Sequence, residues 1–487
     1  MSFDLLNSLL GNLWSVFLIV LFFGGSIFVH ELGHFLAARR RGAKVERFSI
    51  GFGPAIWKWR GKDGVEYRLS WLPLGGYVAL PQLADLGPIE GQSETDVSTL
   101  PPISYATKMI VFAAGAFFNM LFAFALACVL WLAGQQTSED LATTRVGYIS
   151  DTITLPDGST VVSPARQAGF RIGDTIRAID GQSVHDWSEL LQTLVTSSGV
   201  TDDGRRQAVF TIEREGKLQD IVVYPLLVTD DKVRKVGILA AYTPIVAEVP
   251  AKSYAQQLGL QVGDELRELN HQPLLNLIAL YDVFQEKAPK DFVLTVKRGS
   301  RLFDVTVPAD RPRESAGVFG ASYRTASSLI HPNPVAQIVG HVTMTFRVLI
   351  SLFLPHSDIT VSKLSGPVGI GKIFWDASEA GIRYVLWIAI LVNVNLAIFN
   401  LLPIPVLDGG QMLFATIGRL RGQALPANFV AATQSVFMVL LLTLIVYVSV
   451  FDVQRIRRDN KADVQAKEAV EHKKADAQPV PAPAAGK

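Results

Sequence analysis

Four apolar stretches without a charged residue constrain the fold of this chain more than any other feature. They cover residues 5–29, 109–134, 384–407 and 424–451, and each is 24 to 28 residues long. A helix needs about 20 apolar residues to cross the hydrocarbon core of a bilayer. No basic residue precedes the first stretch and no small-residue cleavage site follows it, so it is expected to be retained. The sequence predicts a polytopic α-helical membrane protein with four transmembrane helices.

The composition agrees with membrane spans joined to soluble material. Charged residues make up 18% of the 487 residues, against about 25% in ordinary soluble domains. The net charge of +1 provides no basic surface for nucleic acid, so no nucleic-acid partner is expected. The single cysteine, Cys128, excludes an internal disulfide and a zinc site built from cysteines.

A fifth segment, residues 334–355, is apolar on one side only. Its other side carries His341 and Arg347, and a charged residue in mid-span is costly. We predict an amphipathic helix lying on the membrane surface.

Basic residues beside the spans predict the orientation. Arg39, Arg40 and Arg41 follow the first span, and Arg419 lies between the third and fourth, so both places are expected on the inner side of the membrane. The basic residues after the fourth span conflict with this assignment, which places them outside. The first span usually dominates topology, and we keep its assignment.

The 249 residues between the second and third spans contain an internal repeat. Residues 163–174 align without gaps with residues 253–264, and both copies read Ser-x-Ala-x-x-x-Gly followed by Gly-Asp. The pattern resembles PDZ domains, which bind extended peptides at a sheet edge. We predict two α+β PDZ-like domains on the outer side of the membrane, residues 144–230 and 236–310; a duplicated domain that binds no peptide is the alternative. Residues 81–106 are expected to be a linker and residues 459–487 a disordered tail.

Residues 44–80, which follow the first span, alternate as strands do. A Gly61-Lys-Asp-Gly64 turn separates two runs rich in aromatic residues, and Tyr67 and Leu69 lie in the second run. We predict a membrane-associated β-hairpin inside the first half of the membrane core, residues 1–134. Unpaired strands cannot face lipid, so the hairpin is expected in space lined by protein.

His30-Glu31-Leu32-Gly33-His34 closes the first span. Histidines at positions i and i+4 share one face of a helix, so His30 and His34 can reach a single zinc ion, with Glu31 as the base that removes a proton from water. Ionisable groups beside a long apolar run are expensive unless they are used. The alternative is a polar cluster that only ends the helix.

A catalytic zinc needs a third protein ligand. Glu46 and Glu66 are candidates, but Asp408 is the stronger one, because it lies at the inner end of the third span, within the second half of the core, residues 383–452. With four crossings the inner ends of spans one and three meet the same membrane face.

The residues around Asp408 predict a polar break at membrane depth. Pro403 and Pro405 interrupt the helix before Gly409-Gly410, which frees backbone groups that must line a cavity. We therefore expect this segment to contact substrate, with Asn400 hydrogen-bonding the substrate backbone; a helix-packing role for Asn400 is the alternative.

Together these motifs resemble the site-2 protease family of intramembrane zinc metalloproteases, and most closely its bacterial members with tandem periplasmic PDZ domains. Shared segments include Gly51-Phe-Gly-Pro54, Pro73-Leu-Gly-Gly-Tyr77, Gly115-Ala-Phe-Phe-Asn119 and Ser365-Gly-Pro-Val-Gly369. The resemblance implies Zn²⁺ held by His30, His34 and Asp408, with Glu31 as base. It also implies a hairpin that engages substrate as a strand, which would involve Tyr67 and Leu69.

The family implies a single-span membrane substrate such as an anti-sigma factor already trimmed outside, with signal-peptide remnants as a second class. Membrane lipid is the other expected partner. Two rivals are a membrane-anchored PDZ scaffold without metal and a zinc transporter. A scaffold would need none of the predicted metal-site residues, which are His30, Glu31, His34 and Asp408. A transporter would carry acidic residues along several spans.

Overall fold

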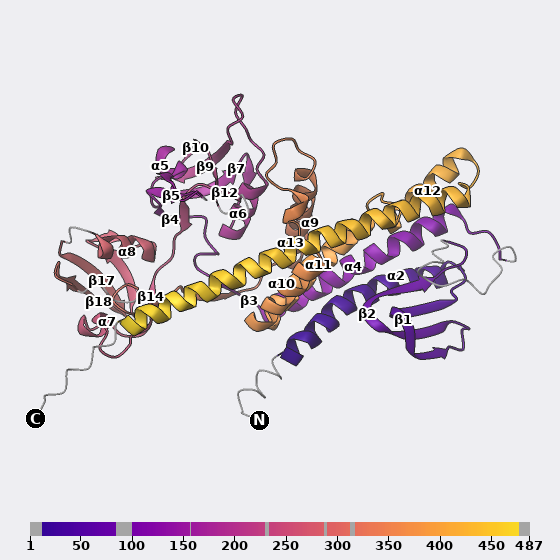
Figure 1. The fold of residues 1–487 in the computed structure, drawn as a ribbon, viewed down its shortest axis with the longest axis horizontal. Coiled ribbons are helices and arrows are strands. Elements are labelled where there is room, and N and C mark those ends of the chain that lie inside the picture. Colours follow the sequence, from indigo (N-terminus) through magenta and orange to yellow (C-terminus); the bar gives the residue numbers. More distant parts are fainter. Residues whose placement is uncertain are drawn as a thin grey trace, which may run out of the picture. The chain divides into compact units, whose positions relative to one another are not determined.

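A computed structural model describes residues 12–83, 100–155, 157–228, 233–286, 290–311 and 317–476 (Figure 1). The chain forms two compact units. Unit 1 contains the residues up to Gln135 together with His331–Phe346 and Leu364–Val453. Unit 2 contains Gln136–Ile330, Arg347–Lys363 and the residues from Gln454 onward.

Four helices among the described residues are long and apolar enough to cross a membrane, as predicted. The first, Asn12–Arg40, includes a π-helical turn, η1 (Val20–Gly24), and continues as α2 (Gly25–Arg40). The other three are α4 (Tyr105–Ala133), α11 (Ile382–Asn400) and the apolar part of α13 (Ala427–Asp476).

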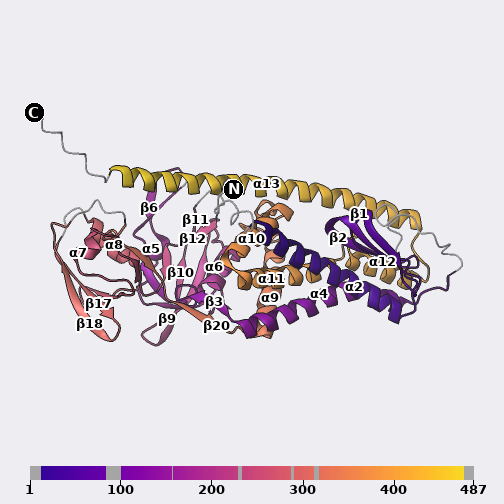
Figure 2. The ribbon, with the colours of Figure 1, turned by 90° about the horizontal axis from the view of Figure 1, so that it is seen from below.

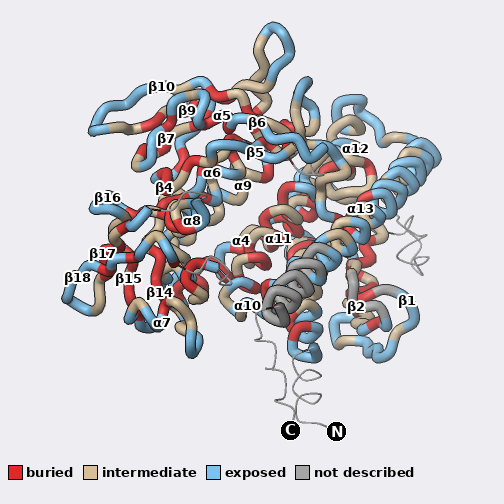
Figure 3. The backbone as a smooth tube through the Cα atoms, turned by 60° about the vertical axis from the view of Figure 1, so that its left-hand side comes forward, coloured by how far each residue is buried: buried red, intermediate tan, exposed pale blue. Residues whose placement is uncertain are grey.

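Helices α2 and α11 both pack against α4 (Figure 2). The approach of α2 is close at Gly33, where an added Cβ atom would lie 2.5 Å from the carbonyl oxygen of Ala114. A buried amide links α2 to α11, because Asn393 donates to Ser26 Oγ over 2.8 Å. The α11 face toward its neighbours is buried, whereas α13 is exposed over most of its described length (Figure 3).

The segment after α2 is a hairpin of two long strands, β1 (Arg47–Arg60) and β2 (Glu66–Ala79). Both strands fold back, so that residues 47–50 pair with residues 66–69 as well as with residues 76–79. Phe48, Val65 and Val78 form a core with Phe35 of α2. The core fixes the hairpin to the helix that carries the two histidines.

Three shorter helices complete the membrane half of the chain: α9 (Pro334–Ser351), α10 (Pro367–Ala380) and α12 (Asp408–Arg421). Helix α9 covers most of the predicted surface helix. Helix α10 was not predicted, and its first turn is capped by a side chain of α13. Asp452, 1% exposed, accepts hydrogen bonds from the backbone N–H groups of Gly366 and Gly369 over 2.9 and 2.8 Å.

Unit 2 holds two β-rich domains with a similar succession of elements, in which the helices of the first recur 90 residues later in the second. The first contains a four-stranded sheet of order β10-β9-β7-β8, and in the second β18, β17, β15, β14 and β19 lie side by side with β16 on β15. The helices are α5 (Pro164–Gln167) and α6 (Trp187–Thr196), then α7 (Tyr254–Gln257) and α8 (Leu277–Gln285). The strands are β3 (Gln135–Ser138), β4 (Val146–Ile149), β5 (Thr152–Thr154), β6 (Thr160–Val162), β7 (Thr175–Ile179), β8 (Gln182–Ser183), β9 (Ala208–Arg214), β10 (Lys217–Val223), β11 (Leu226–Val228), β12 (Val233–Lys235), β13 (Ile238–Ala240), β14 (Ile245–Glu248), β15 (Glu265–Leu269), β16 (Gln272–Pro273), β17 (Phe292–Arg298), β18 (Arg301–Val307), β19 (Ser322–Arg324) and β20 (Ser327–Ile330).

The repeated sequence pattern has the same physical use in both copies. Ser163 and Ser253 cap the short helices α5 and α7 through their hydroxyl groups. The aspartate of each Gly-Asp pair is buried and paired with an arginine of a later strand, Asp174 with Arg214 and Asp264 with Arg298. Both arginines donate two nitrogens, which is the strong geometry for such a pair.

A buried charge cluster ties the segment after α9 to the first β-rich domain within unit 2. The Arg234 side chain is fully buried and donates from Nε to Asp358 over 2.6 Å. Arg206 also donates to Asp358, over 2.8 Å. A buried arginine needs such a partner, so Asp358 holds the 347–363 segment in place.

The predicted disordered tail, residues 459–487, differs from the structure in its first part. Helix α13 continues without a break to Asp476. The sequence between Pro426 and Pro479 contains no proline or glycine, and after the apolar part it is rich in Ala, Lys and Glu, which favour helices. Residues 477–487, and residues 84–99 of the predicted linker, lie outside the described residues.

Candidate metal centre

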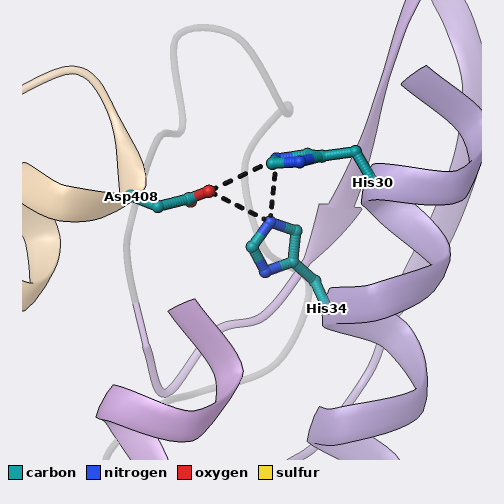
Figure 4. A group of neighbouring side chains, drawn as sticks. All are labelled: His30, His34 and Asp408. Carbon is teal, nitrogen blue, oxygen red and sulfur yellow. Dashed lines mark hydrogen bonds and ion pairs between the residues drawn. The ribbon is translucent and has the colours of Figure 1, made fainter. Parts of the chain in front are cut away.

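His30, His34 and Asp408 meet at one point, although nearly 400 residues separate the histidines from the aspartate in the sequence (Figure 4). Nε2 of His30 and Nε2 of His34 lie 3.1 Å apart. Oδ2 of Asp408 lies 3.3 Å from the first nitrogen and 3.4 Å from the second. The three ligand atoms therefore form a nearly equilateral triangle.

The triangle fits zinc. Ligand atoms 2.0–2.1 Å from a tetrahedral zinc ion are about 3.3–3.4 Å from one another. Oδ2 of Asp408 is buried and accepts no hydrogen bond within the described residues. Two imidazole nitrogens and a carboxylate oxygen with no other partner are a donor set that zinc prefers, and three such ligands leave a fourth position open.

Hydrogen bonds from α4 orient both imidazoles. Nδ1 of His34 donates to the carbonyl oxygen of Val111 over 2.8 Å, which leaves Nε2 unprotonated toward the centre. Nδ1 of His30 lies 3.3 Å from Nδ2 of the Asn119 side chain, which is fully buried. An imidazole that binds metal through Nε2 carries its proton on Nδ1 and needs an acceptor there, which Asn119 can supply when its amide is rotated by 180° to present Oδ1 in place of Nδ2.

Gly115 lets α4 approach the two imidazoles. A Cβ atom added to Gly115 would lie 2.4 Å from Nε2 of His34 and 2.6 Å from Cε1 of His30. These distances are shorter than any ordinary contact, so a side chain at this position would displace one of the rings. The glycine is thus part of the wall of the site.

Glu31 lies next to His30 in α2 and faces the hairpin. A Cβ atom added to Gly76 of β2 would lie 3.1 Å from Cγ of Glu31 and 2.9 Å from the carbonyl oxygen of Ser49. Strand β2 therefore passes against the glutamate with only backbone at the contact. This places extended backbone beside the residue predicted to be the base.

Asp408 is the first residue of α12, directly after the break that follows α11. Residues 401–407 form turns in which Ile404 and Leu407 donate backbone hydrogen bonds three or fewer residues back. Added Cβ atoms at Gly409 and Gly410 would lie 2.3 Å or less from the carbonyl oxygens of Leu401 and Ile404. The two glycines are needed for this close approach, and the turn brings Asp408 to the histidines.

The other candidate ligands are elsewhere. Of the described residues, only His30, His34 and Asp408 form a cluster able to hold a metal ion. Glu66 pairs with Arg68 and Arg47 in the hairpin, and the hydrogen bond from Arg68 lowers the pKa of the Glu66 carboxyl. The backbone N–H of Glu46 donates to the carbonyl oxygen of Ala79 at the end of β2.

The residues predicted to contact substrate have different environments. Asn400 ends α11 and is half-buried, Pro403 is exposed and Pro405 is buried in the break. Leu69 is 40% exposed on the hairpin. Tyr67 packs against Phe35 and donates its hydroxyl hydrogen to Asp63, which favours a structural role for Tyr67.

Val111, Gly115 and Asn119 also belong to the site and were not predicted from the sequence. Gly115 and Asn119 are four residues apart in an apolar span, a spacing that suits simple helix packing equally well. Only the structure shows that the helix they face carries the histidines.

Comparison with known proteins agrees with this centre. The chain is 28% identical over 466 residues to the "Regulator of sigma-E protease RseP" of Escherichia coli, covering 90% of this chain and 99% of that protein. It is 29% identical over 476 residues to the "Regulator of sigma E protease" of Haemophilus influenzae, covering 91% of this chain and 99% of the relative. A "Putative zinc metalloprotease" of Vibrio cholerae is 28% identical over 428 residues, covering 83% of this chain and 90% of that protein.

The model of peptidase family M50 matches residues 17–444, which include α2, the hairpin, both β-rich domains and α12. Members of this family, the site-2 proteases, are zinc-dependent intramembrane proteases. With a match over most of its length and a cluster able to hold the metal, the chain belongs to peptidase family M50.

Proposed function

We propose that His30, His34 and Asp408 hold the catalytic zinc of this protease and that Glu31 is its general base. The observation that supports the ligand set most directly is the spacing of 3.1 to 3.4 Å between the three ligand atoms. Oδ2 of Asp408 adds to this support, because it is buried and accepts no hydrogen bond within the described residues, which is costly unless a cation binds it.

Zinc bound at this centre supplies Lewis-acid chemistry, which polarises a carbonyl group and acidifies water. Glu31 accepts the proton of the attacking water and delivers it to the leaving nitrogen as the peptide bond breaks. Asn119 and the carbonyl group of Val111 hold the imidazoles in the required tautomer.

The substrate in this proposal is a transmembrane segment of a single-span protein. Its helix must unwind before attack, because the peptide bonds of a helix are hydrogen-bonded and shielded. The hairpin, with Gly76 beside Glu31 and Leu69 exposed, offers backbone to which an extended substrate can pair. Asn400, Pro403 and Pro405 line the break next to Asp408 and contact the same segment.

We further propose an anti-sigma factor as substrate, in line with the names of relatives that regulate sigma-E, with signal-peptide remnants as a second class. The β-rich domains act as periplasmic PDZ-like modules that contact substrate or exclude bulky outer domains. The active site opens toward the cytoplasmic side of the inner membrane, in keeping with the basic residues that follow α2.

The decisive experiment measures zinc content and cleavage on the same purified protein, with a single-span reporter segment as substrate. Glu31→Gln is expected to retain stoichiometric zinc and lose cleavage, and Asp408→Ala to lose zinc and cleavage together. Stoichiometric zinc in Asp408→Ala would refute the ligand assignment. A wild type that binds no zinc and cuts nothing while folded would favour the scaffold alternative.

A further inference from the structure

A second site is suggested by a cavity of about 450 Å³ in unit 1, which none of the three proposed metal ligands lines. It lies between the first turns of α4, one side of α12 and the connection that leads into α13. Polar residues occupy one part of its lining and apolar residues the rest, and those that matter here are Tyr105, Lys108, Phe112, Phe414, Arg419 and Leu425.

Two cations face this cavity without an acidic partner among the described residues, Lys108 of α4 and Arg419 of α12. The guanidinium of Arg419 lies 4.7 Å from the centre of the Tyr105 ring. The Tyr105 hydroxyl is in turn 3.1 Å from the hydroxyl of Thr416. The aromatic ring and this hydrogen bond keep Arg419 over the cavity, where it is available to an anion.

The remaining walls are apolar. Phe112 is buried, and Phe414, Leu425 and Val430 continue the apolar lining from α12 to α13. A free inorganic anion would contact only the two cations. An amphiphile would contact the cations through its charged group and the apolar lining through its hydrocarbon part.

The cavity lies where two spans begin. The spanning part of α4 starts at Tyr105 and that of α13 at Ala427, so with four crossings both starts meet the same membrane face. Basic pockets between helices at this depth recognise the headgroups of anionic lipids. We propose that the cavity binds an anionic phospholipid, with its phosphate between Lys108 and Arg419 and its acyl chains along the apolar wall.

Such a lipid would bridge α4 and α12. Helix α12 begins at Asp408 and α4 carries Gly115 and Asn119, so the bound lipid holds together two elements of the metal centre. The binding itself requires neither zinc nor peptidase activity.

The test is native mass spectrometry of the full chain after reconstitution with equal amounts of phosphatidylglycerol and phosphatidylcholine. Wild type is expected to retain phosphatidylglycerol selectively through delipidation. Each Lys or Arg near an anionic surface contributes about a fivefold gain in binding, so Lys108→Gln with Arg419→Gln should lower retention about 25-fold. Ala415→Phe fills the cavity without changing charge and should lower retention as well.

Arg421→Gln is the matched control, because Arg421 is exposed, lies two residues from Arg419 and does not line the cavity. It should leave retention unchanged, as should Lys108→Arg. Equal retention of the two lipids, or equal losses in the control and the double variant, would overturn the proposal. Protection of the fold by inorganic phosphate alone, to the same degree as by lipid, would overturn the lipid assignment.

Discussion

At Gly115 the absence of a side chain sets the distance between α4 and the two imidazoles. A rotamer change that relieves a methyl group 2.4 Å from Nε2 of His34 must move that nitrogen, which is the proposed ligand atom. A substitution of Gly115 is therefore expected to weaken metal binding rather than to destabilise the helix.

Gly115→Ala is expected to lose zinc and cleavage while the protein still folds, because alanine favours a helix over glycine by about 0.5–1 kcal/mol. Zinc per chain, thermal unfolding and cleavage measured on one preparation would show this. Gly25→Ala is the control, since a Cβ atom at Gly25 of α2 meets nothing within 4 Å. Full zinc in Gly115→Ala would contradict the packing argument.

Asn119 offers a sharper test of proton placement. If its oxygen accepts the Nδ1 proton of His30, Asn119→Asp keeps the acceptor and should keep zinc, whereas Asn119→Ala should weaken zinc binding about 10–100-fold. A competition titration with a chelator measures both. Weaker binding in Asn119→Asp than in Asn119→Ala would indicate that the amide donates instead.

At the scale of elements, the junction of α10 with α13 depends on one carboxylate. Asp452 accepts from two N–H groups of the first turn of α10, and a Cβ atom at Gly369 would lie 2.6 Å from its Oδ1. The charge also suits the positive end of a helix. The junction therefore combines a cap with a close approach that only glycine allows.

Asp452→Ala removes this cap and should destabilise the protein by about 1–3 kcal/mol, because the buried N–H of Gly366 and the half-buried N–H of Gly369 lose their acceptor. Thermal unfolding in detergent measures the loss. The exposed Asp459 of the same helix gives a control, and Asp459→Ala should stay within about 0.5 kcal/mol of wild type. Equal shifts in both variants would show that the cap contributes nothing.

The elements differ in how far the sequence could predict them. The four spans follow from apolar length alone, and His30 with His34 from helical spacing, because both signals are local. The position of Asp408 needed the parity of four crossings. Helix α10, the double pairing of residues 47–50 and the role of Asn119 depend on contacts between distant segments, which a single sequence does not reveal.

At the scale of the whole molecule, the 347–363 segment is anchored through Asp358. Burial raises the pKa of Asp358, but hydrogen bonds and charge from Arg206 and Arg234 outweigh it and leave the pKa below its ordinary value. A carboxyl whose pKa is lowered by folding contributes stability above its ordinary pKa and loses it as pH falls through the lowered value. The anchoring should therefore be constant near neutral pH and fail below about pH 4.

Asp358→Asn leaves Arg234 buried without a counter-charge, which costs about 3–5 kcal/mol. Hydrogen exchange of residues 352–363, corrected for intrinsic rates, measures this loss. In Asp358→Asn the segment should lose protection already at pH 7. In the wild type it should lose protection only at acid pH. Asp151→Asn breaks an ion pair between exposed side chains and should change little. Undiminished protection in Asp358→Asn would rule out the anchor.

The proposed exclusion of bulky substrates also belongs to the whole molecule. Deleting residues 146–310 should allow cleavage of a reporter that still carries its outer domain, which wild type leaves intact. Cleavage of the trimmed reporter by the same variant shows that the membrane half still works. An untrimmed reporter that stays uncut would refute exclusion.

Helix α13 finally has a consequence for how this protein can be studied. At 1.5 Å per residue its 50 residues extend about 75 Å, more than twice the hydrocarbon thickness of a bilayer. The 25 residues after Phe451 form about 38 Å of continuous helix beyond the apolar part. A fluorophore attached near Asp476 would lie at the far end of this long helix. A quencher added to one side of the membrane at a time would then show on which side that end of the helix lies.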